Sequence, residues 1–485
     1  MDRHKSRTIL LVHPLGYRSD KASGDISRIA NITPPLGIAS ICAYLLQRQI
    51  KCDIIDCYAL PDSDIKITGY IETEKPDFIG FSCSTSTFLD GVRLAQVAKS
   101  IKPDIKVVFG GAHVSALKES ILEKFENLDY VVAGEGEQTL FELIISDAEN
   151  IPNIKNIVFR SSDGKIIFTG YRKELLKLDS LPFPAYEKLE GYPEKYKLPI
   201  FNYPKTPNSS CISSRGCPYT CSYCDRSVFR KSFRYNSAEY LYKHFKYLSD
   251  NYGVKHVNFY DDQFTFNKKR VIKFCDLMIA NNLKISFNCA ARAEHLDLEL
   301  VTAMKAAGCW MISLGIETGD EELLAQHRQN ADLKMIRNKV KLIKKAGIRV
   351  KALLMMGLPG ETEQSILKSK KYVYSLPIDD FNLAKFTPFP GSPIYQQIKE
   401  GAPLGTFKEN WEEMDCMEFI FIPNGIKKAK LYELFRDFYR SHFMRHKVLF
   451  GYITMIWKSP DSWKRFFLSF FSFIGYVINS KRLKD

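Results

Sequence analysis

Long apolar runs are scarce in this sequence, and their scarcity bears on where the protein resides. At the N-terminus, only residues 9–12 form an apolar run before a histidine and a proline, too few for a signal peptide. Near the C-terminus, residues 466–478 form an uncharged run of 13 residues. As a helix this run is roughly 20 Å long, against a hydrocarbon core of roughly 30 Å. We therefore expect a cytoplasmic protein without a spanning helix.

Internal repeats and low-complexity tracts are also absent. The 485 residues are 45% hydrophobic and 26% charged, a composition that excludes collagen-like and largely disordered chains. A chain of this length exceeds what one hydrophobic core usually accommodates. Two or three folded domains are expected.

The net charge of +14 is unevenly distributed. Residues 426–485 contain 13 Lys and Arg against 4 Asp and Glu, which accounts for +9 of the total. A nucleic-acid-binding protein more often spreads its charge along a groove, whereas here the basic residues alternate with Phe, Trp and Tyr. We expect no nucleic-acid partner, and instead a membrane surface as partner.

The twelve cysteines show no disulfide framework. In a reducing cytoplasm, clustered cysteines more often bind metals or act in catalysis than form disulfides. Nine of them have no ligand spacing and are expected to be small buried residues: Cys42, Cys52, Cys57, Cys83, Cys211, Cys275, Cys289, Cys309 and Cys416.

The other three cysteines, Cys217, Cys221 and Cys224, lie within the stretch GCPYTCSYC. A structural zinc site normally needs four ligands, in two separated pairs, and the next histidine, His244, is 20 residues beyond Cys224. Three thiolates can hold three irons of a 4Fe-4S cluster and leave the fourth iron open to a substrate. The spacing favours such a cluster over a zinc knuckle or a chance grouping of cysteines.

Residues 1–150 alternate short β-branched runs with helical patterns, which predicts a parallel sheet with helices on both faces. The expected strands are 8–13, 52–57, 77–82, 106–110 and 129–133, and the expected helices are 36–47, 89–100 and 138–146. Ligands of such sheets bind beyond the carboxyl ends of the strands. The loops SCSTST (82–87), GGAH (110–113) and GEGE (134–137) are therefore the candidate binding loops.

Residues 151–206 are predicted to form a β-hairpin about Asp163-Gly164 and a proline-rich linker. The β/α rhythm resumes over 207–395, with expected strands at 211–214, 257–261, 285–289, 311–316, 350–356 and 381–386. Six strand-helix units in this length suit a partial (β/α)6 barrel better than a closed eight-fold one. The fold class is thus α/β, followed by a helical C-terminal region over 396–485.

The cysteine spacing, the aromatic Tyr223 and the surrounding SSRGCPYTCSYCD resemble the radical S-adenosylmethionine (SAM) enzymes, and in particular their cobalamin (B12)-binding subgroup. The resemblance implies that a 4Fe-4S cluster on Cys217, Cys221 and Cys224 chelates SAM through its open iron. An electron from the cluster then cleaves SAM to a 5′-deoxyadenosyl radical. A flavodoxin- or ferredoxin-type protein is the implied electron donor.

The same resemblance implies SAM contacts at other strand ends: Tyr223, Asp261 or Asp262, Arg292, Glu317 and the Gly357–Gly360 turn. Glu317 would contact the ribose or amino group, Arg292 the carboxylate side, and Gly357 the adenine or ribose region. The alternative for each charged residue is a structural one, since a carboxylate at a strand end can simply cap a helix or pair with a lysine.

By resemblance, the first domain is a Rossmann-like, flavodoxin-like B12-binding domain. Its loop glycines allow close approach of the corrin ring, and small hydroxyls can bond corrin amides; the alternative is that these glycines only make tight turns. The implied contacts are Ser82, Ser84, Thr85, Gly110, Gly111, Glu135 and Gly136. The D-x-H-x-x-G signature is absent, so we interpret His113 as a loop residue and expect no histidine beneath the cobalt.

The C-terminal segment combines two apolar runs, 448–457 and 466–478, with flanking lysines and arginines. Basic residues beside aromatics are typical of an interfacial membrane anchor. The alternative is a helix packed on the barrel or at a dimer interface. If the anchor exists, the protein is peripheral at the inner face of the membrane.

The predicted function is methylation of an unactivated carbon of an apolar small molecule, such as a lipid, terpenoid or tetrapyrrole. The resemblance equally includes oxidative cyclases and ring-contracting enzymes, among them the anaerobic magnesium-protoporphyrin ester cyclase. A non-catalytic cobalamin- or cluster-binding regulator is the alternative of another class. A methylthiotransferase is disfavoured, since the N-terminal domain has no second set of three cysteines.

Overall fold

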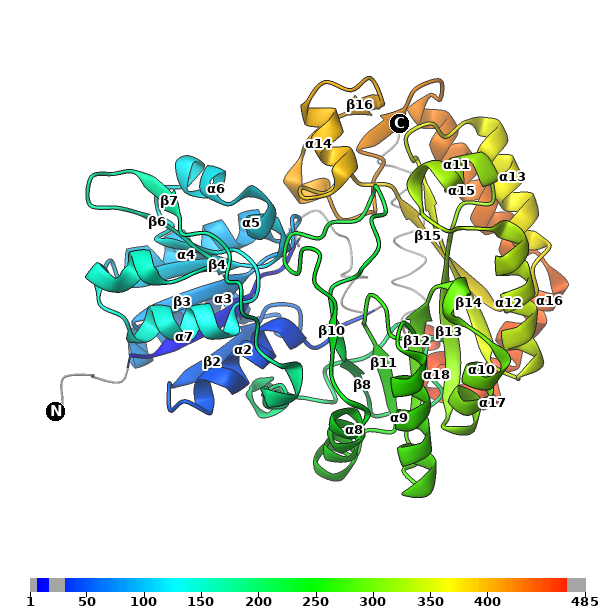
Figure 1. Ribbon diagram of the computed structural model, residues 1–485, viewed down its shortest axis with the longest axis horizontal. Helices are drawn as coiled ribbons and strands as arrows, with labels where there is room; N and C mark the ends of the chain where they lie inside the picture. Colours follow the sequence, from blue (N-terminus) through cyan, green and yellow to red (C-terminus); the bar gives the residue numbers. More distant parts are fainter. Residues whose placement is uncertain (1–6, 17–30, 469–485) are drawn as a thin grey trace.

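The computed structural model describes residues 7–16 and 31–468 and contains two α/β domains side by side, the first blue to cyan and the second green to yellow in Figure 1. A flavodoxin-like domain is followed by a half-barrel with a helical C-terminal region. The predicted fold class is confirmed.

The first domain is built on a seven-stranded sheet of order β2-β1-β3-β4-β5-β6-β7. Its first five strands are parallel and almost wholly buried, because both faces are covered by helices. The strands are β1 (Ile9–His13), β2 (Cys52–Asp56), β3 (Phe78–Ser82), β4 (Lys106–Gly110), β5 (Tyr130–Val132), β6 (Ile157–Arg160) and β7 (Ile166–Phe168). The helices are α2 (Leu36–Leu46), α3 (Ser63–Glu74), α4 (Phe88–Ile101), α5 (Ala112–Leu117), α6 (Glu119–Lys124) and α7 (Glu137–Ile145).

The predicted hairpin is part of the first sheet and not of the linker to which the sequence analysis assigned it. β6 pairs antiparallel with β5, and β7 pairs with β6, so the sheet continues to Phe168. The reason is physical: β5 would otherwise present an unpaired sheet edge, and the hairpin supplies its missing hydrogen bonds. The remaining connection crosses to the second domain through two 3-10 turns, Leu178–Ser180 and Tyr186–Lys188.

The second domain is a curled parallel sheet whose strands follow chain order, β15-β14-β13-β12-β11-β8. Its strands are β8 (Asn208–Cys211), β11 (His256–Phe259), β12 (Ser286–Ala291), β13 (Cys309–Glu317), β14 (Arg349–Met356) and β15 (Asp380–Lys385). The outer helices include α8 (Ala238–Tyr252), α9 (Lys268–Ala280), α10 (Leu298–Ala306), α11 (Glu321–His327), α12 (Leu333–Lys345) and α13 (Glu363–Tyr374). After β15, the short helix α14 (Pro393–Lys399) lies beside the cysteine loop, where the Ile394 N–H donates to the Ser222 carbonyl. This is the partial barrel predicted from the sequence.

The first barrel strand ends earlier than its predicted range of 211–214. After Cys211 the chain leaves the sheet, and β9 (Ser214–Arg215) pairs antiparallel with β10 (Arg234–Tyr235) outside it. The buried carboxylate of Asp261 causes this turn, because it accepts hydrogen bonds from the Ser213 backbone N–H (2.5 Å) and from the Ser214 hydroxyl (2.8 Å).

The C-terminal region begins with a small hairpin, β16 (Gly405–Phe407) and β17 (Phe421–Pro423), and continues with four helices. They are α15 (Lys428–Phe443), α16 (His446–Ile453), α17 (Met455–Lys458) and α18 (Pro460–Leu468). Within residues 7–16 and 31–468, no helix is long and apolar enough to cross a bilayer. Most of the second predicted apolar run, 466–478, lies outside the described residues.

Candidate functional site

The cysteine loop lies between β9 and β10, at the mouth of the half-barrel. Gly216 precedes Cys217 with φ = 84°, and a Cβ there would lie 2.0 Å from the Ser232 carbonyl oxygen. Only glycine is compatible with both the positive φ and this close approach. A glycine directly before Cys217 is therefore a structural requirement of the loop.

The three thiols have different surroundings. Cys221 is buried, Cys217 is half-buried and Cys224 is exposed. Desolvation raises the pKa of Cys217 and raises that of Cys224 to about 12. An iron cluster would reverse this effect, because a coordinating metal deprotonates its thiol ligands.

The thiols fit a cluster better than a single metal ion. In the described part of the chain, no three His, Cys, Asp or Glu side chains converge as ligands of one ion. The three thiolates of a 4Fe-4S cluster need not converge, since they bind different iron atoms. A cation lies beside them as well: Nη1 of Arg292 is 3.7 Å from Sγ of Cys221.

Beside the cysteines, a charged network joins the ends of β12 and β13. Glu317 has φ = 65°, an uncommon conformation for a non-glycine residue, at a register shift between β13 and β14. Its carboxylate accepts a hydrogen bond from Tyr223 and lies 3.7 Å from Nη1 of Arg328. Burial raises the pKa of Glu317, while Arg328 opposes that shift. Tyr223 thus connects the cysteine loop to the strained strand end.

Arg292 completes this network from the end of β12. Its Nε donates to Glu294 at 2.5 Å, its Nη2 donates to the Gln329 carbonyl at 2.6 Å, and its guanidinium stacks 3.7 Å above the Tyr219 ring. The structure therefore brings Tyr223, Arg292 and Glu317 together around Cys221. Sequence reasoning missed Glu294, Arg328 and Tyr219; of these, only Tyr219 had a signal, its place inside the cysteine motif.

The two aspartates after β11 have separate environments. The side chain of Asp261 is fully buried and engaged with Ser213 and Ser214. Its role here is structural, but it neither caps a helix nor pairs with a lysine, the two alternatives considered for it. Asp262 lies at the mouth, where desolvation of its carboxyl together with the Asp261 charge raises its pKa to about 6. It is near enough to Cys217 and Cys224 to influence both thiols.

The loop after β14 contains Gly357, with φ = 97°. Its N–H donates to Glu361, whose carboxylate is 1% exposed and also accepts from the Leu358 backbone. Burial raises the pKa of Glu361 to about 8. This carboxylate holds the turn at the barrel mouth and was not among the predicted site residues.

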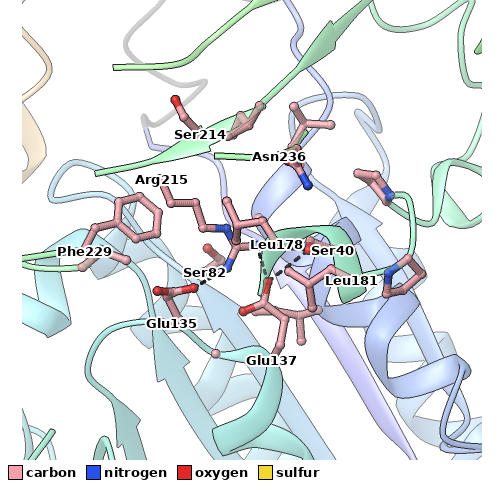
Figure 2. Close-up of a pocket in the computed structure, with 18 of the residues that line it drawn as sticks. Ser40, Ser82, Glu135, Glu137, Leu178, Leu181, Ser214, Arg215, Phe229 and Asn236 are labelled. Carbon is pink, nitrogen blue, oxygen red and sulfur yellow. Dashed lines mark hydrogen bonds and ion pairs between the residues drawn. The ribbon is translucent and has the colours of Figure 1, made fainter. Parts of the chain in front are cut away.

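A cavity of about 180 Å³ separates the carboxyl edge of the first sheet from the barrel (Figure 2). Its walls include Ser82, Gly111, Glu135 and Gly136, which were predicted to contact cobalamin. A smaller slot of about 60 Å³, lined by Gly110, Gly111 and aliphatic side chains, continues between the sheet and its helices.

The slot lies where the glycine loops of the first domain would receive a bound cobalamin. It is closely bounded where glycines are needed: a Cβ on Gly136 would lie 2.8 Å from Cδ1 of Ile41, and one on Gly111 only 2.4 Å from the Cys83 carbonyl oxygen. A Cβ on Gly110 would meet nothing within 4 Å. The open backbone at Gly110 suits the close approach of a flat ring system.

Ser84 and Thr85, in the loop after β3, were predicted to contact cobalamin but do not line either cavity. Ser84 bonds Thr87 through its backbone N–H at 2.9 Å, and Thr85 is buried with its hydroxyl 3.3 Å from Nδ1 of His113. His113 itself is in α5 and not in a loop, packed against Phe88 and Trp411. Burial lowers its pKa to about 4. His113 is not among the residues that line the cavity, whereas the buried His244 is.

An ionic network crosses the cavity between the two domains. Arg215, two residues before Cys217, donates to Glu135 at 2.6 Å and to Glu137 at 2.5 Å (Figure 2). Arg234 also donates to Glu135. Burial works against the charge of Glu137, but Arg215 outweighs it and lowers the pKa of Glu137. Both arginines and Glu137 were missed, although Arg215 stands inside the quoted motif.

Comparisons with known proteins agree with this geometry. Residues 23–144 match the B12 binding domain, and residues 211–373 match the Radical SAM superfamily. The uncharacterized methyltransferase PH0819 of Pyrococcus horikoshii is 29% identical over 449 residues, covering 92% of this chain and 94% of the relative. The anaerobic magnesium-protoporphyrin IX monomethyl ester cyclase of Rubrivivax gelatinosus is 27% identical, covering 91% and 78%.

Solved structures show the same fold. The radical SAM methyltransferase TsrM from Kitasatospora setae superposes with a TM-score of 0.70 at 15% identity, covering 90% of this chain and 89% of TsrM. The cobalamin-dependent radical enzyme OxsB superposes with a TM-score of 0.71 at 16% identity, covering 89% of this chain and 66% of OxsB.

The half-barrel, the three-cysteine loop and the domain match together define a radical SAM enzyme. More narrowly, the chain combines a Radical SAM domain with a B12 binding domain. Its cofactors are a 4Fe-4S cluster, SAM and cobalamin, as predicted.

Proposed function

We propose that this protein methylates an unactivated carbon of an apolar small molecule. The observation that carries the proposal is the shared wall between the two cofactor regions. Arg215 belongs to the loop that contains the cysteines, yet it bonds Glu135 and Glu137 of the B12 binding domain. A substrate that presents its reacting carbon at the barrel mouth beside this wall would face both regions at once.

The bound cofactors would supply a 5′-deoxyadenosyl radical and a transferable methyl group. The chain's own residues hold the cofactors and exclude water. Cys217, Cys221 and Cys224 would hold the cluster, while Tyr223, Arg292 and Glu317 provide donors and acceptors for the amino, carboxylate and ribose groups of SAM. Ser82 and the loop glycines of the first domain, which line the two cavities there, would hold cobalamin.

The similarity to PH0819 supports methylation, because that relative bears the name of a methyltransferase. The similarity to the Rubrivivax gelatinosus cyclase supports the second candidate, an oxidative cyclisation in which no methyl group reaches the substrate. A flavodoxin- or ferredoxin-type electron donor is part of either proposal, since the cluster needs one electron for each radical.

The test distinguishes the two candidates without a known substrate. The full chain, reconstituted anaerobically with iron, sulfide and hydroxocobalamin, is given methyl-deuterated SAM and a strong reductant. Mass spectrometry then follows S-adenosylhomocysteine and 5′-deoxyadenosine. Methylation predicts S-adenosylhomocysteine in an amount matching the cobalamin present. Deoxyadenosine without any S-adenosylhomocysteine would contradict methylation and favour cyclisation.

A further inference from the structure

A second cavity lies inside the half-barrel and is separate from the interdomain one. It has a volume of about 250 Å³ and lies between the strands β11 to β14 and the connecting segment around Pro199. Its walls are mainly apolar and include Leu198, Met311 and Leu353. At one end it reaches Asp261, the residue that fixes the start of the cysteine loop. The cavity therefore extends from the interior of the barrel toward the reactive centre.

One cation in this cavity lacks a counterion among the described residues. Lys351, on β14, lines the wall, and its Nζ has a polar contact with Oδ1 of Asn202 at 3.5 Å. Within the described ranges, no carboxylate lies within the 4.0 Å of an ion pair from Lys351. The acidic group in the wall, Asp261, is already engaged by Ser213 and Ser214.

The position of Lys351 is fixed by its surroundings. The sheet register pairs it with Ser313 on β13 and with Asp380 on β15. Asn202 is held in turn by Asn288, whose side-chain amide donates to the Asn202 carbonyl at 2.5 Å. An ammonium group in a half-buried cavity with mainly apolar walls favours an anionic ligand, because water screens its attraction to an anion less there than on the open surface.

We propose that this cavity binds the substrate and that Lys351 anchors an anionic group on it. The inference rests on the proposed function, in that it supplies the substrate class: an apolar molecule with a carboxylate or phosphate. Such a molecule would extend its apolar body from Lys351 past Leu353 toward the barrel mouth. Lys351 is a specificity-determining residue in this scheme.

The test uses isothermal titration of the reconstituted full chain with octanoate, octyl phosphate and 1-octanol. Lys351→Met should weaken octanoate binding at least tenfold and leave 1-octanol binding unchanged. The matched control is Lys334→Met, at an exposed lysine on α12, which should bind octanoate like the wild type. Tighter binding of octyl phosphate than of octanoate would identify a phosphate-bearing substrate, and the reverse a carboxylate.

Equal octanoate affinity in the wild type and in Lys351→Met would overturn the anchor. Deoxyadenosine and S-adenosylhomocysteine are measured on the same samples, so the two proposals fail separately. If SAM turnover is normal but octanoate binding does not depend on Lys351, only the role of Lys351 as the anchor is contradicted. Lys351-dependent binding without any S-adenosylhomocysteine contradicts only methylation.

An independent observation concerns the surface of α16 and α17. Leu449, Phe450, Ile453, Ile456 and Trp457 are exposed, Trp457 by 75% and Phe450 by 68%. Their spacing of one, four, seven and eight residues places them on one side of consecutive helical turns. The opposite side is packed, since Val448 and Met455 are buried.

Exposed lysines border this apolar face. Lys447 precedes it, Lys458 ends it, and Lys464 follows on α18. The one acidic residue of residues 444–468, Asp461, is engaged by the Tyr203 hydroxyl at 2.7 Å. An apolar stripe with Trp and Phe, bordered by lysines, is complementary to a bilayer surface that contains anionic lipid.

We infer that the α16–α17 face docks on an anionic membrane surface and lies in its plane. The residues of α18 follow the alternative prediction, a helix packed on the barrel. It is fixed to the barrel by Ser462, which accepts from the Phe201 N–H at 2.9 Å, and by Arg465, which donates to the Leu198 carbonyl at 2.8 Å. The docking face thus lies next to a helix that is held firmly on the protein.

Co-sedimentation with vesicles tests the docking. The full chain should bind vesicles of phosphatidylcholine with 30% phosphatidylglycerol, and 0.5 M salt should weaken the binding. Phe450→Ser combined with Trp457→Ser should reduce the bound fraction at least fivefold. Ile65→Ser, at an exposed apolar residue on α3, is the matched control and should bind normally.

Unchanged sedimentation of the double variant would overturn the inference. Light scattering coupled to size-exclusion chromatography tests the alternative that a second copy of the chain binds this face. A wild-type dimer that becomes a monomer in the double variant, without vesicle binding by either, would assign the face to self-association and likewise overturn the inference.

Discussion

At the scale of single residues, this site is defined by a few side chains whose chemistry has no substitute. Three thiols in one loop, a strained glutamate at a strand end and a buried carboxylate under a glycine turn each have a specific task. Cys221 is the most enclosed of the thiols, and Arg292 and Tyr223 both contact it. Removal of any one of these groups leaves a defect that neighbouring residues cannot repair.

Cys221→Ala should abolish the cluster and, with it, SAM cleavage, because two thiols cannot hold three irons. After anaerobic reconstitution, we expect iron content near background and deoxyadenosine formation at least 100-fold below the wild type. Cys416→Ala, at a half-buried cysteine without ligand spacing, is the control and should retain both. Wild-type deoxyadenosine formation in a cluster-free Cys221→Ala protein would refute the assigned role of the cysteines.

Glu361 should make stability depend on pH. Burial raises its pKa to about 8 from a usual value of 4.5, so between these values the native state binds more protons than the unfolded state. The free energy of unfolding therefore falls as pH rises from about 5 to 8. Each pKa unit corresponds to about 1.4 kcal/mol, which makes the effect on the order of a few kcal/mol.

Glu361→Gln mimics the protonated carboxyl and should remove this dependence. Thermal unfolding at pH 5 should be similar in the two proteins, and at pH 8 the variant should unfold at the higher temperature. Parallel melting curves across this range would show that Glu361 does not titrate there.

At the scale of elements, the site depends on how strand ends are connected to loops. The cysteine loop departs from the barrel directly after β8, and one carboxylate on the neighbouring strand end fixes its first turn. Asp261 takes hydrogen bonds from the backbone and hydroxyl of Ser213 and from the hydroxyl of Ser214. Sheet pairing between β8 and β11 brings these residues together although 48 positions separate Ser213 from Asp261.

Asp261→Asn should therefore disturb the cysteine loop, because Asp261 acts through Ser213 and Ser214 and not through contact with a cofactor. An amide presents N–H groups where the carboxylate accepts, and a buried donor without an acceptor costs about 1–3 kcal/mol. Denaturant unfolding should show a loss of that size, and reconstituted iron content should fall. Asp163→Asn, in the exposed turn of the β6–β7 hairpin, should change neither quantity.

At the scale of the whole molecule, the two domains are held at the cavity by charges that are largely buried. Arg215 has 15% of its side chain exposed, Glu135 has 12% and Glu137 has 4%. These ion pairs join residues of the two domains, so they form only while the domains are in contact. The interdomain contact is accordingly part of the site and not merely a connection.

Arg215→Met should loosen this contact. Removal of one partner of a buried pair costs about 3–5 kcal/mol, because the remaining charge stays buried. We expect calorimetry to show lower stability, and hydroxocobalamin binding to weaken, while Arg93→Met, at an exposed ion pair with Asp64, changes stability by less than about 1 kcal/mol. Hydroxocobalamin affinity equal to that of the wild type would show that the network does not shape the cavity.

The sequence determined the class of fold, because the alternation of buried strands and amphipathic helices is a local property of the chain. It predicts both domains and the positions of most of their strands along the chain, and the spacing of the three cysteines by itself indicates the cluster. Strand ends also draw attention to Arg292, Glu317 and Gly357. The sequence alone assigns the hairpin to the linker, because nothing local to it shows which sheet edge it completes.

Only the tertiary structure decided which residues meet. Arg215 and Glu135 are 80 positions apart, and Arg328 reaches Glu317 only because α11 folds back over the end of β13. Lys351 is notable because the register of β14 turns it into an apolar cavity where no described carboxylate pairs with it. Charge pairing and cavity walls depend on distance in space, and a sequence specifies that distance only through the packed fold.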